Sequence, residues 1–182
     1  NVATAGDTIM IKAGTYTTNQ SIPYRSTLST GSPVIIRPAT GETVNFTTIA
    51  VDTSKITLRG PDFNVRSMDI GNGGDSASRR TDITLDGLNV DAQDTTNTDA
   101  IWAGNTTNLT LRNSRVGNTM AGTGASDTAK SVMTCAGNST CHNINMVFED
   151  NLFYDADTPS GSLAHLECIW AGGVQGFTLR RN

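Results

Sequence analysis

Seven copies of one short pattern constrain this chain more than any other feature of its sequence. Each copy reads apolar, any residue, apolar, charged, and a turn residue follows. Their first residues lie 25, 22, 27, 26, 37 and 31 positions apart along the chain. The copies are Ile9–Lys12, Val34–Arg37, Ile56–Arg59, Ile83–Asp86, Leu109–Arg112, Met146–Glu149 and Phe177–Arg180. Repetition at a period of about 20–50 residues is typical of a solenoid.

The alternation within each copy places its two apolar residues on one face of a strand. A strand this short buries its apolar face only by stacking on the next copy. A coil of about 22 residues accommodates three short strands and three turns. The sequence therefore predicts an all-β, right-handed parallel β-helix, a single-stranded solenoid of about seven coils. We expect residues 1–182 to form one domain that is a segment of a longer chain.

Two further elements repeat in each coil. An apolar residue follows seven positions after the start of four copies, at Phe63, Val90, Val116 and Phe153. Between the two strands come Gly60, Gly87, Asn113 and Asp150, residue types that tolerate a left-handed backbone. The third element appears twice, as Asp99–Gly104 and Glu167–Gly172, each with a central Ile-Trp pair. A leucine-rich horseshoe or a propeller would need helices or longer strands, so both are weaker alternatives.

The repeats resemble those of the pectate-lyase-like right-handed β-helix superfamily. Ala5–Ile9 with Ala13–Tyr16 resembles the opening coil of secreted bacterial members, and Asn151–Phe153 through Asn182 resembles later coils. Glu167-Cys168-Ile169, before a coil that ends at Asn182, is similar to the calcium-binding coil of chondroitinase-B and alginate-lyase types. The resemblance implies a carbohydrate-active or adhesive protein. The sequence departs from the lyase pattern because it has no Asp-His pair after a strand and no Arg-x-Pro-x-x-Arg.

Three cysteines bear on the compartment. Cys135 and Cys141 flank a five-residue loop short enough to be closed by a disulfide, which predicts a secreted or cell-surface protein. We expect Cys168, in an apolar run, to be a buried free thiol. A zinc site is the weaker alternative, since only His142 lies nearby.

The two longest intervals between copies are the candidate functional loops, because a solenoid places its insertions outside the stack. They contain residues 120–126 and 155–161. His165 is the candidate acid-base residue, although a lone His is more often a surface or capping residue. Lys130 is the only Lys in the longest interval and is a candidate catalytic base.

Four carboxylates are candidate calcium ligands: Asp99, Asp155, Asp157 and Glu167. Calcium bound there would neutralise a uronate, and a nearby Lys or Arg would take the acidified α-proton. The alternative for Asp99 and Glu167 is that both are solvated.

Two pairs of residues are candidates for substrate binding. Trp102 and Trp170 share a register, so they form either a sugar-stacking platform or a buried stack. Arg112 and Arg180 belong to a column of charges in which Asp86 lies beside Arg112, and Glu149 lies between Arg112 and Arg180. We favour an exposed charge ladder over a groove for acidic sugars.

Two functions follow from these features. The first is a secreted β-helix that binds or cleaves an acidic polysaccharide, by calcium-assisted β-elimination if it is a lyase-like enzyme. The second is a non-catalytic structural or adhesive module of a surface fibre or filament, whose partner is a second copy. With a net charge of −4 and no long basic cluster, a nucleic-acid partner is not expected. No apolar stretch is long enough to predict a membrane span.

Overall fold

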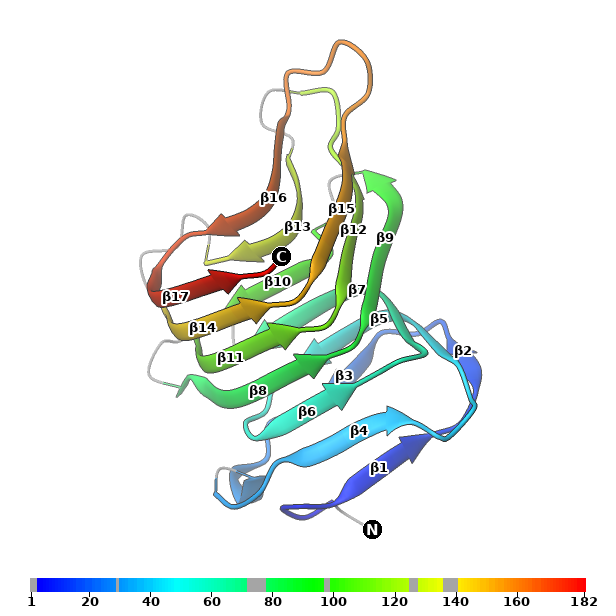
Figure 1. Ribbon diagram of the computed structural model, residues 1–182, viewed down its shortest axis with the longest axis vertical. Helices are drawn as coiled ribbons and strands as arrows, with labels where there is room; N and C mark the ends of the chain where they lie inside the picture. The colour runs from blue at the N-terminus through cyan, green and yellow to red at the C-terminus, as the bar shows by residue number, and fades with distance from the viewer. Residues whose placement is uncertain (1–2, 29, 72–77, 97–98, 125–127, 136–140) are drawn as a thin grey trace.

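A computed structural model describes residues 3–28, 30–71, 78–96, 99–124, 128–135 and 141–182, with only the backbone of residues 94–96, 128 and 165. The elements that the structure describes are strands that pair in parallel, together with a short 3-10 helix, η1 (Ser26–Leu28). Successive strands stack upward in two sheets (Figure 1). The predicted all-β stack of parallel strands is therefore confirmed.

The first sheet contains the seven repeats in chain order. It runs β1 (Thr8–Ile11), β4 (Val34–Pro38), β6 (Ile56–Arg59), β8 (Arg80–Asp86), β11 (Thr106–Arg112), β14 (Asn143–Glu149) and β17 (Val174–Arg180). From Val34 to Phe177 the first residues of the copies are register partners. The first copy differs, because Ile9 pairs with Ile36 rather than with Val34. A shift of two residues keeps the same side chains on the core face, so the pattern survives it.

The second sheet holds the other strands of each coil. Its order is β15 (Leu152–Asp157), β12 (Arg115–Met120), β9 (Asn89–Thr96), β7 (Phe63–Gly71), β10 (Ile101–Gly104), β13 (Thr128–Thr134) and β16 (His165–Ala171). Below it, β5 (Val44–Val51) pairs with β7 and also with β2 (Gly14–Tyr16) and β3 (Gln20–Ile22). The strands β5 and β7 are long enough to pair with two separate strands each: β5 pairs with β2 and β3, and β7 pairs with β9 and β10.

One predicted alignment in this sheet is wrong. Val65, not Phe63, is the partner of Val90, and Val116 and Phe153 follow in the same column. The turn after β6 contains Gly60-Pro61-Asp62, so Val65 comes nine residues after Ile56 where Val90 comes seven after Ile83. The two additional residues leave the parity of the strand, and hence its buried face, unchanged.

The core lies between the two sheets and consists of aliphatic columns. Ile56, Ile83, Leu109 and Met146 are buried in one column, and Val65, Val90 and Val116 in the sheet opposite. The turns between the sheets use the predicted left-handed residues, with positive φ at Gly87, Asn113 and Asp150. The stacked turns also approach closely, since a Cβ on Gly60 would lie 1.9 Å from the carbonyl oxygen of Gly87.

The two expelled loops pack on one another above the stack, at the top of Figure 1. Ser162 Oγ donates a hydrogen bond to the Gly122 carbonyl at 2.7 Å, and the Ala121 N–H donates to the Asp157 carbonyl at 3.0 Å. Residues 125–127 of the first loop lie outside the described residues. Two arms, one formed by β12 and β13 and the other by β15 and β16, extend the stack in this way. The candidate site lies mainly on β13 and β16, the second strand of each arm.

Candidate functional site

Three ionisable residues lie on neighbouring strands at the base of the arms. Lys130 on β13 and Glu167 on β16 are register partners. The Ala100 N–H donates a hydrogen bond to the Lys130 carbonyl at 3.0 Å, which places Asp99 at the same level just before β10. Asp99 and Glu167 occupy equivalent positions in the repeated sequence element, and in the structure Lys130 lies on the strand between them. We call Asp99, Lys130, Glu167 and the adjacent Trp170 the Lys130 cluster.

Lys130 is the most buried member of this cluster. Its side chain is 2% exposed, whereas that of Glu167 is 35% exposed. Its Nζ atom lies 4.0 Å from Glu167 Oε2 and 4.8 Å from the centroid of the Trp170 ring. Burial of an unpaired ammonium would be very costly, and here a carboxylate and an aromatic face offset that cost. The geometry thus holds one positive charge beneath a ring that reaches solvent.

Both carboxylates keep an oxygen that is buried without a hydrogen-bond partner, Asp99 Oδ1 and Glu167 Oε2. Burial raises the pKa of Asp99, and the negative charge of Glu167 adds to this effect. The attraction of Lys130 and a hydrogen bond to its backbone oppose the rise in pKa but do not cancel it. Burial therefore favours the protonated form of Asp99, and Glu167 is the carboxylate that solvent reaches. The expectation that both are solvated is wrong for these two oxygens.

The two tryptophans lie in one column on the outer side of the second sheet. Trp102 pairs with Met133, and Met133 pairs with Trp170. Trp170 is 38% exposed, and Trp102 is partly buried with its ring over Gly104, where a Cβ would lie 2.2 Å from the indole. Of the two, Trp170 presents a ring face that a sugar could stack on, and it is the one beside Lys130.

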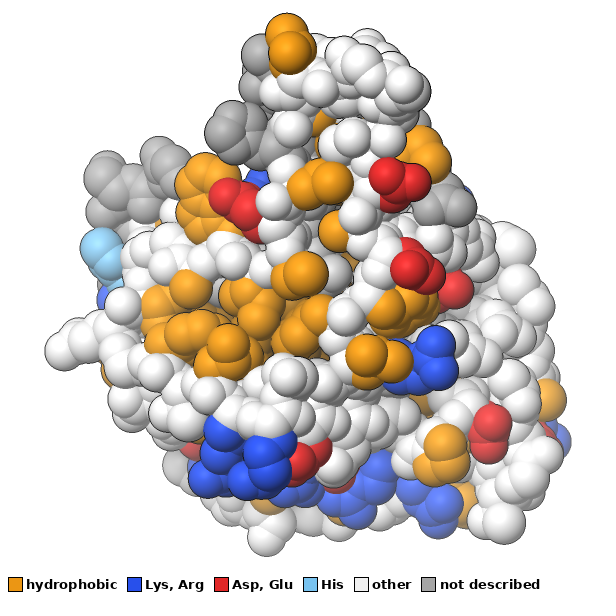
Figure 2. All heavy atoms as spheres, turned by 45° about the horizontal axis from the view of Figure 1, so that its top comes forward, with side chains coloured by type: hydrophobic (Ala, Val, Ile, Leu, Met, Phe, Trp, Pro, Cys, Tyr) orange, Lys and Arg blue, Asp and Glu red, His pale blue; other side chains and the backbone are white. Residues whose placement is uncertain are grey.

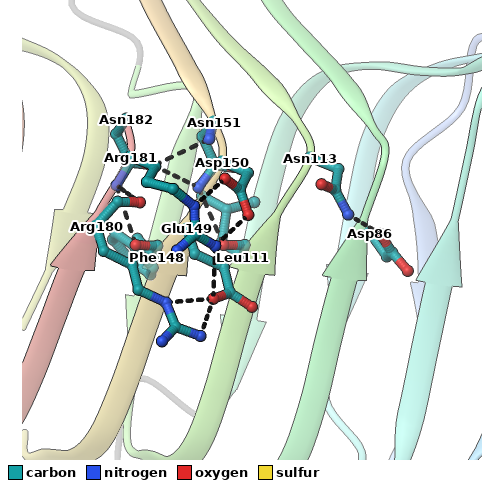
Figure 3. Close-up of polar contacts among 10 residues, drawn as sticks. All are labelled: Asp86, Leu111, Asn113, Phe148, Glu149, Asp150, Asn151, Arg180, Arg181 and Asn182. Carbon is teal, nitrogen blue, oxygen red and sulfur yellow. Dashed lines mark hydrogen bonds and ion pairs between the residues drawn. The ribbon is translucent and has the colours of Figure 1, made fainter.

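The charged column of the first sheet forms ion pairs between coils (Figure 3). Asp86 lies between Arg59 at 3.6 Å and Arg112 at 2.9 Å. Glu149 pairs with Arg180 and Arg181, as Figure 3 shows. Asp86 also accepts a hydrogen bond from Asn113 at 2.9 Å. Burial raises the pKa of Asp86, but the bonds from Asn113 and Arg112 outweigh it and the pKa is lowered. The predicted charge ladder is confirmed: Arg112 pairs with Asp86, and Arg180 pairs with Glu149.

The remaining predicted site residues lie on β15 and β16. Asp155 follows Tyr154 on β15, and Asp157 Oδ1 accepts a hydrogen bond from the Thr158 N–H at 2.7 Å. His165 begins β16, but its side chain lies outside the described residues. Within the part of the chain that the structure describes, no three His, Cys, Asp or Glu side chains gather closely enough to hold a metal ion.

The disulfide between Cys135 and Cys141 is present, with Cα atoms 5.2 Å apart, as predicted. Cys168 is free, but the prediction that it is buried is wrong, because its side chain is exposed. It lies on β16, an end strand of its sheet, so no further strand covers it on one side. Alternation predicts the face of a residue but not whether a neighbouring strand covers it.

Two polar grooves contain residues that the sequence analysis did not propose as a site. One lies beside the disulfide and is lined by Arg79, His142, Gly173 and Gln175, with Arg79 Nε donating to the His142 carbonyl at 3.1 Å. The other crosses the outer face of β5, β7 and β9 and is lined by a row of asparagines. A signal for the second was available, since Asn45, Asn64 and Asn89 each directly precede a buried apolar residue of the same strand element.

Neither a family model, nor a curated protein, nor a solved structure matches this chain. Among the described residues, no helix is long and apolar enough to cross a membrane. The fold and the site therefore define the chain only as an all-β protein of stacked parallel strands, stapled by a disulfide, with a buried lysine between two carboxylates.

Proposed function

We propose that this chain is a secreted right-handed parallel β-helix of the pectate-lyase-like kind that binds and cleaves an acidic polysaccharide. The observation that carries the proposal is the Lys130 cluster. It combines an ammonium, a protonatable carboxyl group and an accessible carboxylate, which can supply charge neutralisation, an acid and a base for β-elimination of a uronate, with a ring face on which a sugar can stack. The disulfide is consistent with an extracellular location.

The surroundings of Lys130 change its proposed role from base to charge stabiliser. Lys130 Nζ lies 4.0 Å from Glu167 Oε2 and beneath the Trp170 ring, an ion-paired position that suits charge stabilisation better than proton abstraction. In the proposed reaction its charge neutralises the uronate carboxylate, and Glu167 takes the proton from the sugar carbon next to that carboxylate. The bond between the neighbouring carbon and the glycosidic oxygen breaks as the carbon–carbon double bond forms. Asp99, whose pKa is raised, supplies the proton to the leaving oxygen.

Calcium assistance stays a prediction. The described residues bring Asp99 and Glu167 together but do not provide the six or more oxygen ligands that calcium takes. Lys130 already places a positive charge between them. The proposed reaction therefore has no step that uses calcium. The involvement of calcium is tested by running each assay with added calcium and with a chelator.

The proposal is tested by incubating the protein with pectate, alginate and chondroitin and measuring the ultraviolet absorbance of an unsaturated uronate product. We expect product with one of these polymers, and no product from the Lys130→Met or Glu167→Gln variants. An Arg37→Gln variant, changed on the first sheet away from the cluster, serves as the control and should retain activity. Absence of product with all three polymers, with and without calcium, would remove the lyase function.

A second candidate is a structural or adhesive module that associates with further copies. It is favoured by apolar side chains exposed around the end of the stack that carries β16 and β17, where Figure 2 shows a hydrophobic patch bordered by basic side chains. Leu152 is 50% exposed there and Leu179 52%. Sedimentation over a range of protein concentrations distinguishes this function, since a chain that stays monomeric at high concentration does not build filaments.

A further inference from the structure

The outer face of the second sheet carries a polar groove that is separate from the Lys130 cluster. The groove has a volume of about 260 Å³ and is lined by residues of β5, β7 and β9. Its lining includes Asn64, Arg66, Asn89, Asp91 and Gln93. We propose that this groove, extended across β12 and β15, binds a linear uronate polysaccharide whose chain runs across the strands.

A ladder of side-chain amides forms the first part of the groove. Asn64 Nδ2 donates to Asn45 Oδ1 at 3.0 Å, and Asn89 Nδ2 donates to Asn64 Oδ1 at 3.1 Å. Each amide has two N–H donors and two acceptor lone pairs, so the ladder uses only part of its capacity. The remaining donors and acceptors recur at the strand spacing of about 4.8 Å. Sugar hydroxyls both donate and accept, so they pair well with such an array.

The register continues this array onto two more strands. Asn89 pairs with Arg115 on β12, and in the next column Asp91 pairs with Gly117, which pairs with Tyr154 on β15. Gly117 occupies an outer-face position without a side chain. A Cβ there would lie 1.8 Å from the Tyr154 carbonyl oxygen and 3.0 Å from its ring carbon Cδ1. The missing side chain lets the Tyr154 ring lie close against β12.

Tyr154 and Arg115 form a platform at this end of the groove. The Arg115 guanidinium lies 5.1 Å from the centroid of the Tyr154 ring. Tyr154 is partly buried, which raises the pKa of its hydroxyl, and the charge of Asp91 adds to the rise. An aromatic face with an adjacent guanidinium suits a pyranose ring that carries a carboxylate.

Two guanidinium groups, Arg66 and Arg115, can pair with the carboxylates of an acidic ligand, although Asp91 and Asp155 lie near the same platform. Asp91, the acidic residue lining the groove, accepts hydrogen bonds from Asn118 Nδ2 at 2.7 Å and from the Gln93 N–H at 2.9 Å, which partly satisfy its charge. Arg66 lines the groove and Arg115 lies exposed beside it. A uronate chain would place its carboxylates against these guanidinium groups and its hydroxyls on the amide ladder.

This inference rests on the substrate class of the proposed function, but not on the chemistry of Lys130. Binding is therefore measured by calorimetry in the Lys130→Met variant, which cannot consume the ligand, with oligosaccharides of galacturonate, of alginate and of neutral xylose. We expect one uronate series to bind and the neutral series to bind at least about tenfold more weakly. Adding Tyr154→Ala or Arg115→Gln should raise the Kd at least about tenfold, because Tyr and Arg are typical binding hot spots.

Arg37→Gln is the matched control, since it removes the same charge from the first sheet, and it should leave the Kd unchanged. Arg115→Gln changes only an exposed side chain, so it keeps the test valid if Tyr154→Ala does not fold. Three results would each overturn the proposed binding groove. They are equal affinity for the neutral and uronate series, equal affinity of the groove and control variants, and no binding of any uronate. Uronate binding without cleavage by the unaltered chain would remove the lyase function and leave the groove standing.

Discussion

Lys130 and Glu167 face one another across adjacent parallel strands, with Nζ 4.0 Å from Oε2, yet one side chain is buried and the other is one-third exposed. A buried ion pair of this kind contributes little net stability, because the cost of desolvation offsets the attraction between the charges. Removing the lysine alone is costly, because Glu167 Oε2 would stay buried without its counter-charge. The cluster is better explained by what it does than by what it stabilises.

The first prediction separates those two roles. Lys130→Met should lower the free energy of unfolding by about 3 kcal/mol, because Glu167 Oε2 stays buried without its counter-charge, and it should abolish cleavage of the acidic polymer in the folded fraction. Urea unfolding followed by circular dichroism measures the stability, and product absorbance measures the activity. A purely structural lysine would show the same loss of stability, with cleavage retained in the folded fraction.

The second prediction concerns the pH dependence that Asp99 confers. Burial raises the pKa of Asp99 above its ordinary value of 3.8, so the folded chain favours the protonated form. Ionisation then costs stability as the pH rises from 3.8 through the raised pKa. Asp99→Asn removes this cost, so the stability of the variant relative to the unaltered chain should increase from low to neutral pH. A constant difference across that range would contradict the assigned burial.

The third prediction concerns Asp86 in the charge ladder, where the change of stability with pH has the opposite sign to that of Asp99. Asp86 has a lowered pKa, so its stabilisation is present above the ordinary value of 3.8 and is lost as the pH falls through the lowered pKa. Asp86→Asn should therefore cost about 1–2 kcal/mol at neutral pH, through its weakened bonds to Arg112 and Asn113. The cost should shrink in strongly acidic solution. Measuring both Asp variants in the same urea series makes each the control for the other.

The fourth prediction concerns the cysteines. One thiol per native chain should react with a thiol reagent without denaturant, because Cys168 is exposed and the other two cysteines are bridged. Cys168→Ser should remove that reaction. Reduction of the disulfide should lower the free energy of unfolding by about 2 kcal/mol, as expected for a loop this short. Three reactive thiols in the native chain would contradict the bridge.

Much of the fold could be predicted because its repeats are local and redundant. The apolar-x-apolar copies specify which residues face the core, and a misjudged turn, as after β6 or at Ile9, changes the partner by two residues without exposing the core. A shift of two residues keeps the same side chains on the core face, so the pattern identifies the stack even where it predicts the wrong partner for an individual residue. The hand of the winding stays a prediction.

The site was predicted less completely because side chains gather across coils. Glu167, Lys130 and Asp99 come from three elements up to 68 positions apart in sequence, and only their stacking level unites them. The exposure of Cys168 follows from its place on the end strand β16, which no periodic pattern encodes. The Tyr154 platform depends on Gly117, whose importance appears only when the neighbouring strand is placed.

The most direct test of the central claim follows the lysine ammonium groups themselves. The chain contains three lysines, Lys12, Lys55 and Lys130, so selective nitrogen labelling of lysine gives a side-chain NMR spectrum that can be assigned with one variant for each. On titration with a uronate oligosaccharide that the protein cleaves, the Lys130 signal should shift while those of Lys12 and Lys55 stay in place. A Lys130 signal that does not move at saturating oligosaccharide would contradict the proposal that its charge meets the substrate.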